Sequence, residues 1–299
     1  MSFLTIFTAS KPFVNPHIIT IQRNAIQSWS RLTDVEVILL GDEPGIGETA
    51  DELGVRHVPD VERDERGVPT VRSVMEQGHA FSSSPILCYA NADMILMSDI
   101  VEAARKVSGQ VKDFLMVGQR WNLDITSEID FNGDWEARLR DEVTIRGEFY
   151  TPWGIDYFVF PRHLYIDVPD FTIGRPAWDN WMVYHARSTW GVAIDATRSV
   201  LVIHQNHDYS HLPGNKPPYG SEVAKQNLAK AGGRRCVYHV MDTNKELITG
   251  KVRNPRFHLG RIFRRLERYF ITESMAGWRG RIAIILGKVA RSLASIPRR

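Results

Sequence analysis

The amino-acid sequence predicts an α/β protein with a mixed, mainly parallel sheet flanked by helices, and with a basic helical extension at its C-terminus. Over the first hundred residues, short apolar runs typical of buried strands alternate with segments of helical periodicity. In residues 251–299, thirteen Lys or Arg stand against two acids, a net charge of +11. Because the whole chain carries +2, residues 1–250 carry −9, which indicates a basic appendage on an acidic domain.

The sequence predicts strands and helices that alternate along the chain. In the first hundred residues the expected strands are 3–8, 35–40, 55–58 and 85–90, and the expected helices are 16–32, 47–53 and 70–81. Further on, strands are expected at 114–118, 155–161, 191–194 and 199–204, and helices at 134–146 and 176–187. Ligands bind at the carboxyl ends of the strands of such sheets, so the residues that follow each strand are the first candidates for a site.

Composition narrows the class of protein. Hydrophobic residues make up 43% of the 299 residues and charged residues 24%, which is ordinary for a globular domain. The two cysteines cannot form a disulfide framework, and Cys88 lies in an apolar run, which fits a buried free thiol in a reducing cytosol. The N-terminus lacks the features of a signal peptide, and no apolar run is long enough to span a membrane. We therefore expect a cytoplasmic protein.

The strongest local feature is Asn91-Ala92-Asp93, which directly follows an apolar strand. Asp93 could hold Mg²⁺ or Mn²⁺, cations that take oxygen ligands and bind phosphates together with the protein. Asn91 could supply an amide oxygen or bind a ribose. An ordinary turn is the alternative interpretation, because Asn and Asp favour turns.

The order of these features resembles the nucleotide-binding half of GT-A glycosyltransferases. That family has a first strand with a polar loop, a second strand ending in an acid, a helix, and an apolar strand ending in Asp-x-Asp, which binds metal and diphosphate. This chain departs from the pattern at Asn91. The resemblance implies that Asp93 is the direct metal ligand and that Asp42 contacts the base or ribose. It also implies that Thr8 and Ala9 contact the nucleotide through their backbone.

The resemblance extends to the acceptor half. Residues 153–162 resemble the family's segment of a Gly, an apolar strand and a terminal Arg, and they place Asp156 among the acceptor-binding candidates. Asp179 occupies the position of the acid that serves as general base in inverting members. It would equally suit the first turn of a helix. Trp178 and Trp181 flank it and are candidate surfaces for a sugar ring, although two tryptophans in a helix are often core residues.

Residues 200–211 lead from a buried strand into a loop with three histidines and an aspartate. Imidazole is a common ligand of transition metals such as Mn²⁺, and many GT-A enzymes use a late histidine as a metal ligand. His207 is the first candidate and His204 the second. A polar loop with one hydrogen-bonded histidine is the alternative, and a zinc site is disfavoured by the lack of paired cysteines.

Two basic residues are candidates for binding the diphosphate. Lys216 lies in the Gly/Pro-rich segment 212–220, which in the family closes over the donor and excludes water; a surface linker is an equally good interpretation. Arg72 lies at the start of an expected helix, where backbone N–H groups and a guanidinium suit an anion. Arg72 could equally be a surface residue.

The basic tail has helical periodicity in residues 256–270 and again in 278–296, with apolar residues on one side and arginines mainly on the other. Basic amphipathic helices are typical of proteins that bind an anionic membrane surface. The alternative is a pair of helices that pack on the domain with a solvated basic side. Nucleic-acid binding is not expected, since no recognised module accompanies the charge.

Together these features predict a GT-A-like domain over residues 1–250, with a nucleotide-binding half (1–100) and an acceptor half (101–250), followed by the tail 251–299. The expected reaction is Mn²⁺- or Mg²⁺-assisted transfer of a sugar from a nucleoside diphosphate sugar to a saccharide or glycolipid, in polysaccharide synthesis at the inner face of the membrane. It inverts configuration if Asp179 is the base. The alternatives are a sugar-phosphate nucleotidylyltransferase and a non-catalytic saccharide- or membrane-binding protein.

Overall fold

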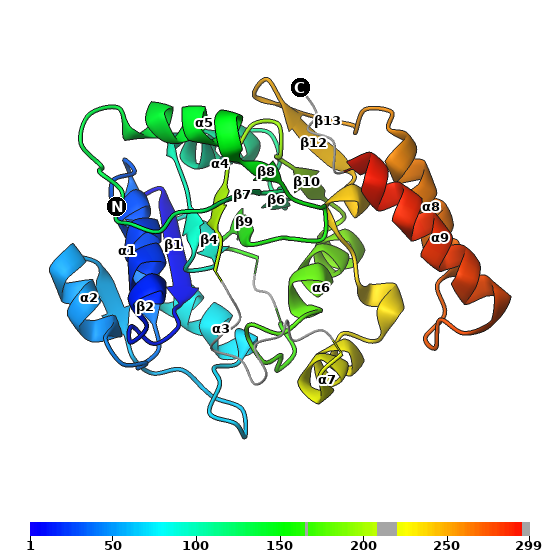
Figure 1. Cartoon of the computed structure of the whole chain (residues 1–299), viewed down its shortest axis with the longest axis horizontal. Coiled ribbons are helices and arrows are strands. Elements are labelled where there is room, and N and C mark those ends of the chain that lie inside the picture. Colours follow the sequence, from blue (N-terminus) through cyan, green and yellow to red (C-terminus); the bar gives the residue numbers. More distant parts are fainter. Residues whose placement is uncertain (165–166, 208–219, 295–299) are drawn as a thin grey trace.

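A nine-stranded sheet runs through the computed structural model, which describes residues 1–164, 167–207 and 220–294. The strands lie in the order β13-β12-β10-β6-β9-β4-β1-β2-β3 (Figure 1). They are β1 (Leu4–Ala9), β2 (Val35–Leu40), β3 (Arg56–Val58), β4 (Ile86–Ala90), β6 (Leu115–Val117), β9 (Tyr157–Pro161), β10 (Ala193–Asp195), β12 (Lys245–Ile248) and β13 (Lys251–Arg253). Only β9 and β13 run antiparallel to their neighbours among these strands. The predicted mixed, mainly parallel sheet is confirmed.

Helices pack on both faces of the sheet (Figure 1). In the domain they are α1 (Pro16–Ser30), α2 (Ile46–Leu53), α3 (Val71–Phe81), α4 (Ser98–Ser108), α5 (Trp135–Arg146), α6 (Trp178–His185) and α7 (Glu222–Lys230). Successive side chains of a strand point to opposite faces. In β1, Leu4 and Ile6 therefore join the core on the side of α1 and α4, whereas Phe7 packs on the side of α3 and α6. Burial on both faces explains the uninterrupted apolar run of this strand.

A second, four-stranded sheet adjoins the first in the order β5-β11-β7-β8. Its strands are β5 (Met94–Ile95), β7 (Trp121–Leu123), β8 (Glu148–Phe149) and β11 (Ile203–Gln205). The chain passes from β4 of the large sheet to β5 of the small one through residues 91–93. The predicted Asn-Ala-Asp corner is thus the junction between two sheets.

The C-terminal segment forms two helices, α8 (Leu259–Phe270) and α9 (Gly277–Ala294), which pack against each other at one end of the molecule (Figure 1). A tail packed on the domain was predicted to keep its basic side in solvent. Instead, Arg261 and Arg264 of α8 are buried. Arg261 pairs with Asp195 at 3.1 Å, and Arg264 pairs with Asp242 at 2.9 Å. The acidic domain therefore draws the basic side of α8 inward. The division of the chain at residue 250 stays a prediction.

Several elements lie outside the expected set, namely α4, α7 and the short strands β5, β7, β8, β12 and β13. Strands of two to four residues leave little periodicity to detect. The partners of β5, β7 and β8 are also distant in the sequence, whereas β12 and β13 are adjacent strands that pair with each other. Among the helices in the described part of the chain, none combines the length and the apolar character needed to cross a bilayer.

Gly78 of α3 tests the packing of this helix on β1. A Cβ at this position would overlap the ring of Phe7. We expect Gly78→Ala to destabilise the protein by about 1–3 kcal/mol, even though alanine favours a helix, because overpacking outweighs propensity. Gly47→Ala in α2 is the matched control, since its Cβ would lie in ordinary contact with His57, 3.5 Å away. Denaturant unfolding of both variants measures the difference, and equal stability of the two would contradict this packing.

Candidate active site

A cavity of about 900 Å³ opens at the edge of the large sheet where β1 and β4 end. Ligands of α/β proteins bind in this position. Its walls come from segments far apart in the sequence. They include Ala9 and Lys11 after β1, Asn91 and Asp93 after β4, Arg120 after β6, Trp153 and Asp156 before β9, Trp178 and Asp179 in α6, His204 and His207 around β11, and Arg291 in α9.

Asp93, His204 and His207 form a group that could hold a metal ion. One ligand atom from each lies within 4.8 Å of the others. The Nε2 atoms of His207 and His204 are 3.1 and 3.9 Å from Asp93 Oδ2. Asp93 Oδ1 is buried and has no hydrogen-bond partner among the described residues. One carboxylate and two imidazoles suit Mn²⁺ better than Mg²⁺, which prefers oxygen ligands throughout.

The charges around this group favour the ligand forms of its members. Burial by itself raises the pKa of Asp93, but His204, His207 and Lys11 outweigh it and hold that pKa well below its usual range. Burial, and then the nearby Arg120, lower the pKa of His204 to about 4. At neutral pH the group therefore offers a carboxylate and, at His204, a neutral imidazole, which are the protonation states that bind metals.

Lys11 lies beside this group. Its Nζ lies 3.1 Å from His207 Nε2 and 3.9 Å from Asp93 Oδ2. Burial lowers its pKa, and Asp93 partly offsets that effect. A half-buried ammonium next to a metal group is well placed to bind a phosphate oxygen.

Asn91 faces a different set of partners. Its Nδ2 donates to Asp156 Oδ1 at 2.9 Å, and its Oδ1 accepts from the Tyr89 hydroxyl at 3.1 Å. Asp156 also pairs with Arg120 at 2.7 Å. An Asp at position 91 would set a second carboxylate against Asp156, whereas the amide donates to it. The amide at position 91 therefore suits its neighbour Asp156 better than a carboxylate would.

Asp179 lies in the first turn of α6 and lines the cavity. Ala177, just before this helix, has a φ of 91°, a strained value for a residue other than glycine. The Oδ1 atom of Asp179 is buried without a hydrogen-bond partner in the described part of the chain. Burial, supported by the nearby Asp156 and opposed by backbone N–H groups, raises the pKa of Asp179 to about 7. A carboxylate with such a pKa can accept a proton near neutral pH.

Aromatic rings form another wall of the cavity. Trp178 packs edge-on against Tyr89, with the ring centroids 5.3 Å apart. Trp153 packs against His239 at 4.5 Å, and the guanidinium of Arg264 lies 5.3 Å from its ring centre. Trp181, by contrast, stacks on His185 at 4.7 Å and is not among the described residues that line the cavity.

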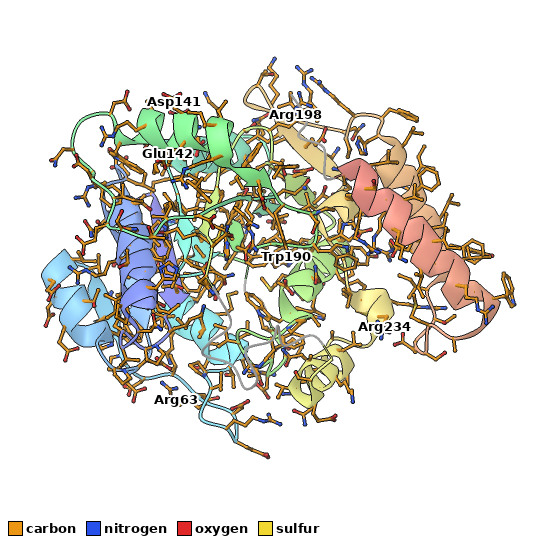
Figure 2. The ribbon with its side chains drawn as sticks, viewed as in Figure 1. Arg63, Asp141, Glu142, Trp190, Arg198 and Arg234 are labelled. Carbon is orange, nitrogen blue, oxygen red and sulfur yellow. The ribbon has the colours of Figure 1, made fainter. Side chains whose placement is uncertain are left out.

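Other predicted site residues lie away from the cavity lining as far as it is described. Asp42 is exposed and pairs with Arg63, which Figure 2 shows on the loop between β3 and α3, whereas the next residue, Glu43, lines the cavity. Arg72 pairs with Asp170 at the surface, and Thr8 is buried in β1. Lys216 and residues 212–219 lie outside the described residues. The roles assigned to all of these residues stay predictions.

Arg120, Trp153 and Arg291 line the cavity but lie outside the set of site residues predicted from the sequence. Arg120 could have been found, since it follows a predicted strand at the edge where the other candidates lie. Arg291 carries no such signal, because only the packing of α9 brings it to a cavity built by residues 9–207.

No family model and no curated protein sequence matches the chain. Its structure is similar to that of glucosyl-3-phosphoglycerate synthase from Mycobacterium tuberculosis in complex with Mn²⁺, UDP and phosphoglyceric acid, at 16% identity and a TM-score of 0.47, over 86% of this chain and 88% of that chain. A further structure of that enzyme covers 77% of this chain and 81% of its own, with 16% identity and a TM-score of 0.46. A mycobacterial protein matches at 16% identity and a TM-score of 0.45, over 77% of this chain and 75% of its own. A likeness at this level assigns neither a family nor an activity to the chain.

The metal group predicts that Mn²⁺ stabilises the folded protein. At a concentration about 100-fold above its dissociation constant, a ligand adds about 2.7 kcal/mol of stability. We expect Mn²⁺ to raise the Tm of the wild type more than Mg²⁺ does, and to leave the Tm of Asp93→Asn unchanged. Each variant is compared with itself with and without metal, and the exposed Asp42→Asn is the control that keeps the response. A Tm rise that survives in Asp93→Asn would place the metal elsewhere.

Proposed function

We propose that the chain is a glycosyltransferase that moves a sugar from a nucleoside diphosphate sugar to a saccharide or glycolipid acceptor. One observation carries the proposal. A single cavity holds both a group suited to a divalent cation, built on Asp93, and a separate carboxylate, Asp179, with a pKa near neutrality. These are the two functions that an inverting transfer requires, namely stabilisation of a diphosphate leaving group and removal of a proton from the acceptor.

The donor would bind on the side of the metal group. Asp93, His204 and His207 would hold Mn²⁺, which supplies positive charge to the departing diphosphate. Lys11 and Arg63 line the same cavity and would add positive charge around the phosphates. Glu43 also lines the cavity, so it is a better placed carboxylate for a ribose hydroxyl than the exposed Asp42.

The acceptor would bind between Asp179 and the aromatic wall. Asp179 would take the proton of the acceptor hydroxyl while that oxygen bonds to the anomeric carbon and the bond from this carbon to the diphosphate oxygen breaks. Attack opposite the leaving group inverts the configuration. Trp153 and Trp178 offer ring faces or edges for the sugar. A glycolipid acceptor would bring the enzyme to the cytoplasmic face of a membrane, in the synthesis of a polysaccharide.

The alternatives are less well supported. A nucleotidylyltransferase calls for a Gly-rich, Arg-containing loop after the first strand, and this chain has Ser10-Lys11-Pro12 there. A binding protein derived from a transferase needs no titrating carboxylate, yet this chain keeps one at Asp179, whose Oδ1 is buried, at a cost in stability.

Donor hydrolysis tests the activity directly. Without acceptor, we expect slow release of a nucleoside diphosphate from at least one sugar nucleotide of a panel, and we expect this release to require Mn²⁺. Asp93→Asn should reduce it by about 100-fold or more, because the leaving group loses its metal. The panel is read by hydrolysis and by thermal shift together. The absence of both turnover and a thermal shift with every donor of the panel would refute the proposal.

The role of Asp179 predicts opposite effects of one variant on rate and on stability. A general base is active when deprotonated, so the transfer rate should rise with pH and level off above about pH 7. Asp179→Asn should lower the rate by about 10²–10⁴-fold and remove this pH dependence. Transfer assays with the donor found in the panel, across pH, measure both.

The stability effect has the reverse sign. Because the folded pKa is raised, the folded state binds the proton more tightly, and the wild type loses stability as pH rises from about 4 through about 7. Asp179→Asn avoids that loss and should be more stable than the wild type at about pH 8, by on the order of a few kcal/mol. Thermal unfolding at about pH 5 and pH 8 measures this. A variant that is less stable at the higher pH would indicate a structural carboxylate instead.

A further inference from the structure

Helix α8 is amphipathic, and it turns its charged side, not its apolar side, toward the protein. Its buried residues are Gly260, Arg261, Arg264 and Glu267. Arg261 contacts Asp195 at 3.1 Å and Glu246 at 3.7 Å, so its charge is neutralised inside. Ion pairs thus hold α8 on the domain, and its apolar residues are left for the outer side.

Helix α9 packs through small residues. Those buried are Gly280, Ala283, Gly287, Ala290 and Ala294, spaced three or four apart along one side. A Cβ at Gly287 would overlap the carboxylate of Glu267 in α8. The two helices therefore approach closely, and Trp278, Ile284 and Ile285 of α9 remain exposed.

The outer side of the hairpin formed by α8 and α9 is consequently apolar. The exposed large residues of α8 are Leu259, Ile262, Leu266 and Tyr269, and those of α9 are Trp278, Ile284 and Ile285. Tyr269 and Trp278 keep 72% and 67% of their surface exposed. Figure 2 shows side chains projecting from this end of the molecule, beyond the labelled Arg234. A concentration of exposed apolar side chains of this kind marks an interaction surface.

Positive charges surround these apolar residues. Arg256, Arg265, Arg281 and Lys288 are exposed. The two acids of residues 251–294 do not balance them: Glu267 is buried, and Glu273 accepts a hydrogen bond from the backbone of Arg234 at 3.1 Å. Exposed aromatic and aliphatic side chains within a basic rim complement the acyl boundary and headgroups of an anionic bilayer.

We infer that the outer side of the α8–α9 hairpin docks on the surface of a bilayer that contains anionic lipid. A second copy of the chain is a poorer occupant. In a twofold interface the same patch meets itself, so Arg265 and Arg281 would face like charges, and the exposed acid of the hairpin, Glu273, is already hydrogen-bonded to Arg234.

The hairpin also reaches the cavity. Arg291 of α9 lines it, and Arg264 and Arg291 lie 5.3 and 6.0 Å from the ring centre of Trp153, another lining residue. If the cavity binds an acceptor as proposed above, docking holds its Trp153 wall one layer of helices away from the lipid surface, because Arg264 contacts Trp153 from the inner side of the hairpin. The docking itself rests only on the exposed residues of the hairpin.

Vesicle flotation of the full chain tests the docking. We expect it to bind vesicles of phosphatidylcholine mixed with phosphatidylglycerol, and to bind phosphatidylcholine alone only weakly. The triple variant Leu266→Ser, Tyr269→Ser and Trp278→Ser should bind the mixed vesicles at least tenfold more weakly, because it loses buried apolar area. Ile145→Ser is the matched control with unchanged binding, since Ile145 is 83% exposed on α5, outside the hairpin.

A second variant separates charge from apolar contact. Arg265→Gln with Arg281→Gln should weaken binding by about fivefold per residue and reduce its dependence on salt. Trp fluorescence should shift to the blue on binding in the wild type, with a smaller shift in Trp278→Phe. Hydrolysis of the free donor in the absence of lipid should be unaffected in all these variants, which separates failure of docking from failure of the transferase proposal.

Two results would overturn the inference. One is a wild type that does not float with mixed vesicles even at low salt. The other is a dimer, measured by light scattering, that the triple variant abolishes while vesicle binding is unchanged, since that result would assign the surface to a second copy of the chain.

Discussion

The antiparallel pairing of β5 with β11 is the constraint on which the candidate site depends. It places His204 opposite Met94, next to Asp93. Buried Gln205 holds the two strands together, since its backbone N–H and its Nε2 both donate to the carbonyl of Asp93 at 3.2 Å. Its side chain also donates to Ile21 in α1 at 2.7 Å and accepts from Asn24 at 3.0 Å. A fully satisfied polar group of this kind fixes one arrangement, because each unpaired partner would be costly in the interior.

Charge within the cavity is divided between two carboxylates with opposite tendencies. Asp93 lies among His204, His207 and Lys11, which hold its pKa low, whereas burial in the first turn of α6, beside Trp178, raises the pKa of Asp179 to about 7. A third carboxylate, Asp156, pairs with Arg120 and accepts a hydrogen bond from Asn91. Environments that separate the pKa values of neighbouring acids are a general means of giving one site both an ionised ligand and a proton acceptor.

Ion pairs also determine how the C-terminal helices are oriented on the domain. The acidic domain binds arginines of α8 through Asp195, Asp242 and Glu246, and this pairing determines which side of the helix faces solvent. The apolar side is left outward together with the remaining basic residues. An orientation set by ion pairs in the interior therefore produces an exposed apolar surface, without any element that is long and apolar enough, among the described helices, to cross a bilayer.

The sequence by itself determined the alternation of strands and helices in the first hundred residues, because buried strands and amphipathic helices leave strong local patterns; β2, for instance, has the predicted bounds. It also marked Asp93, His204, His207 and Asp179, whose residue types carry chemistry wherever they lie. Only the tertiary structure decided that these four line one cavity, that Asn91 serves Asp156, that Glu43 rather than Asp42 lines the cavity, and that α8 turns its arginines inward. These outcomes depend on contacts between residues far apart in the chain, on which local periodicity carries no information.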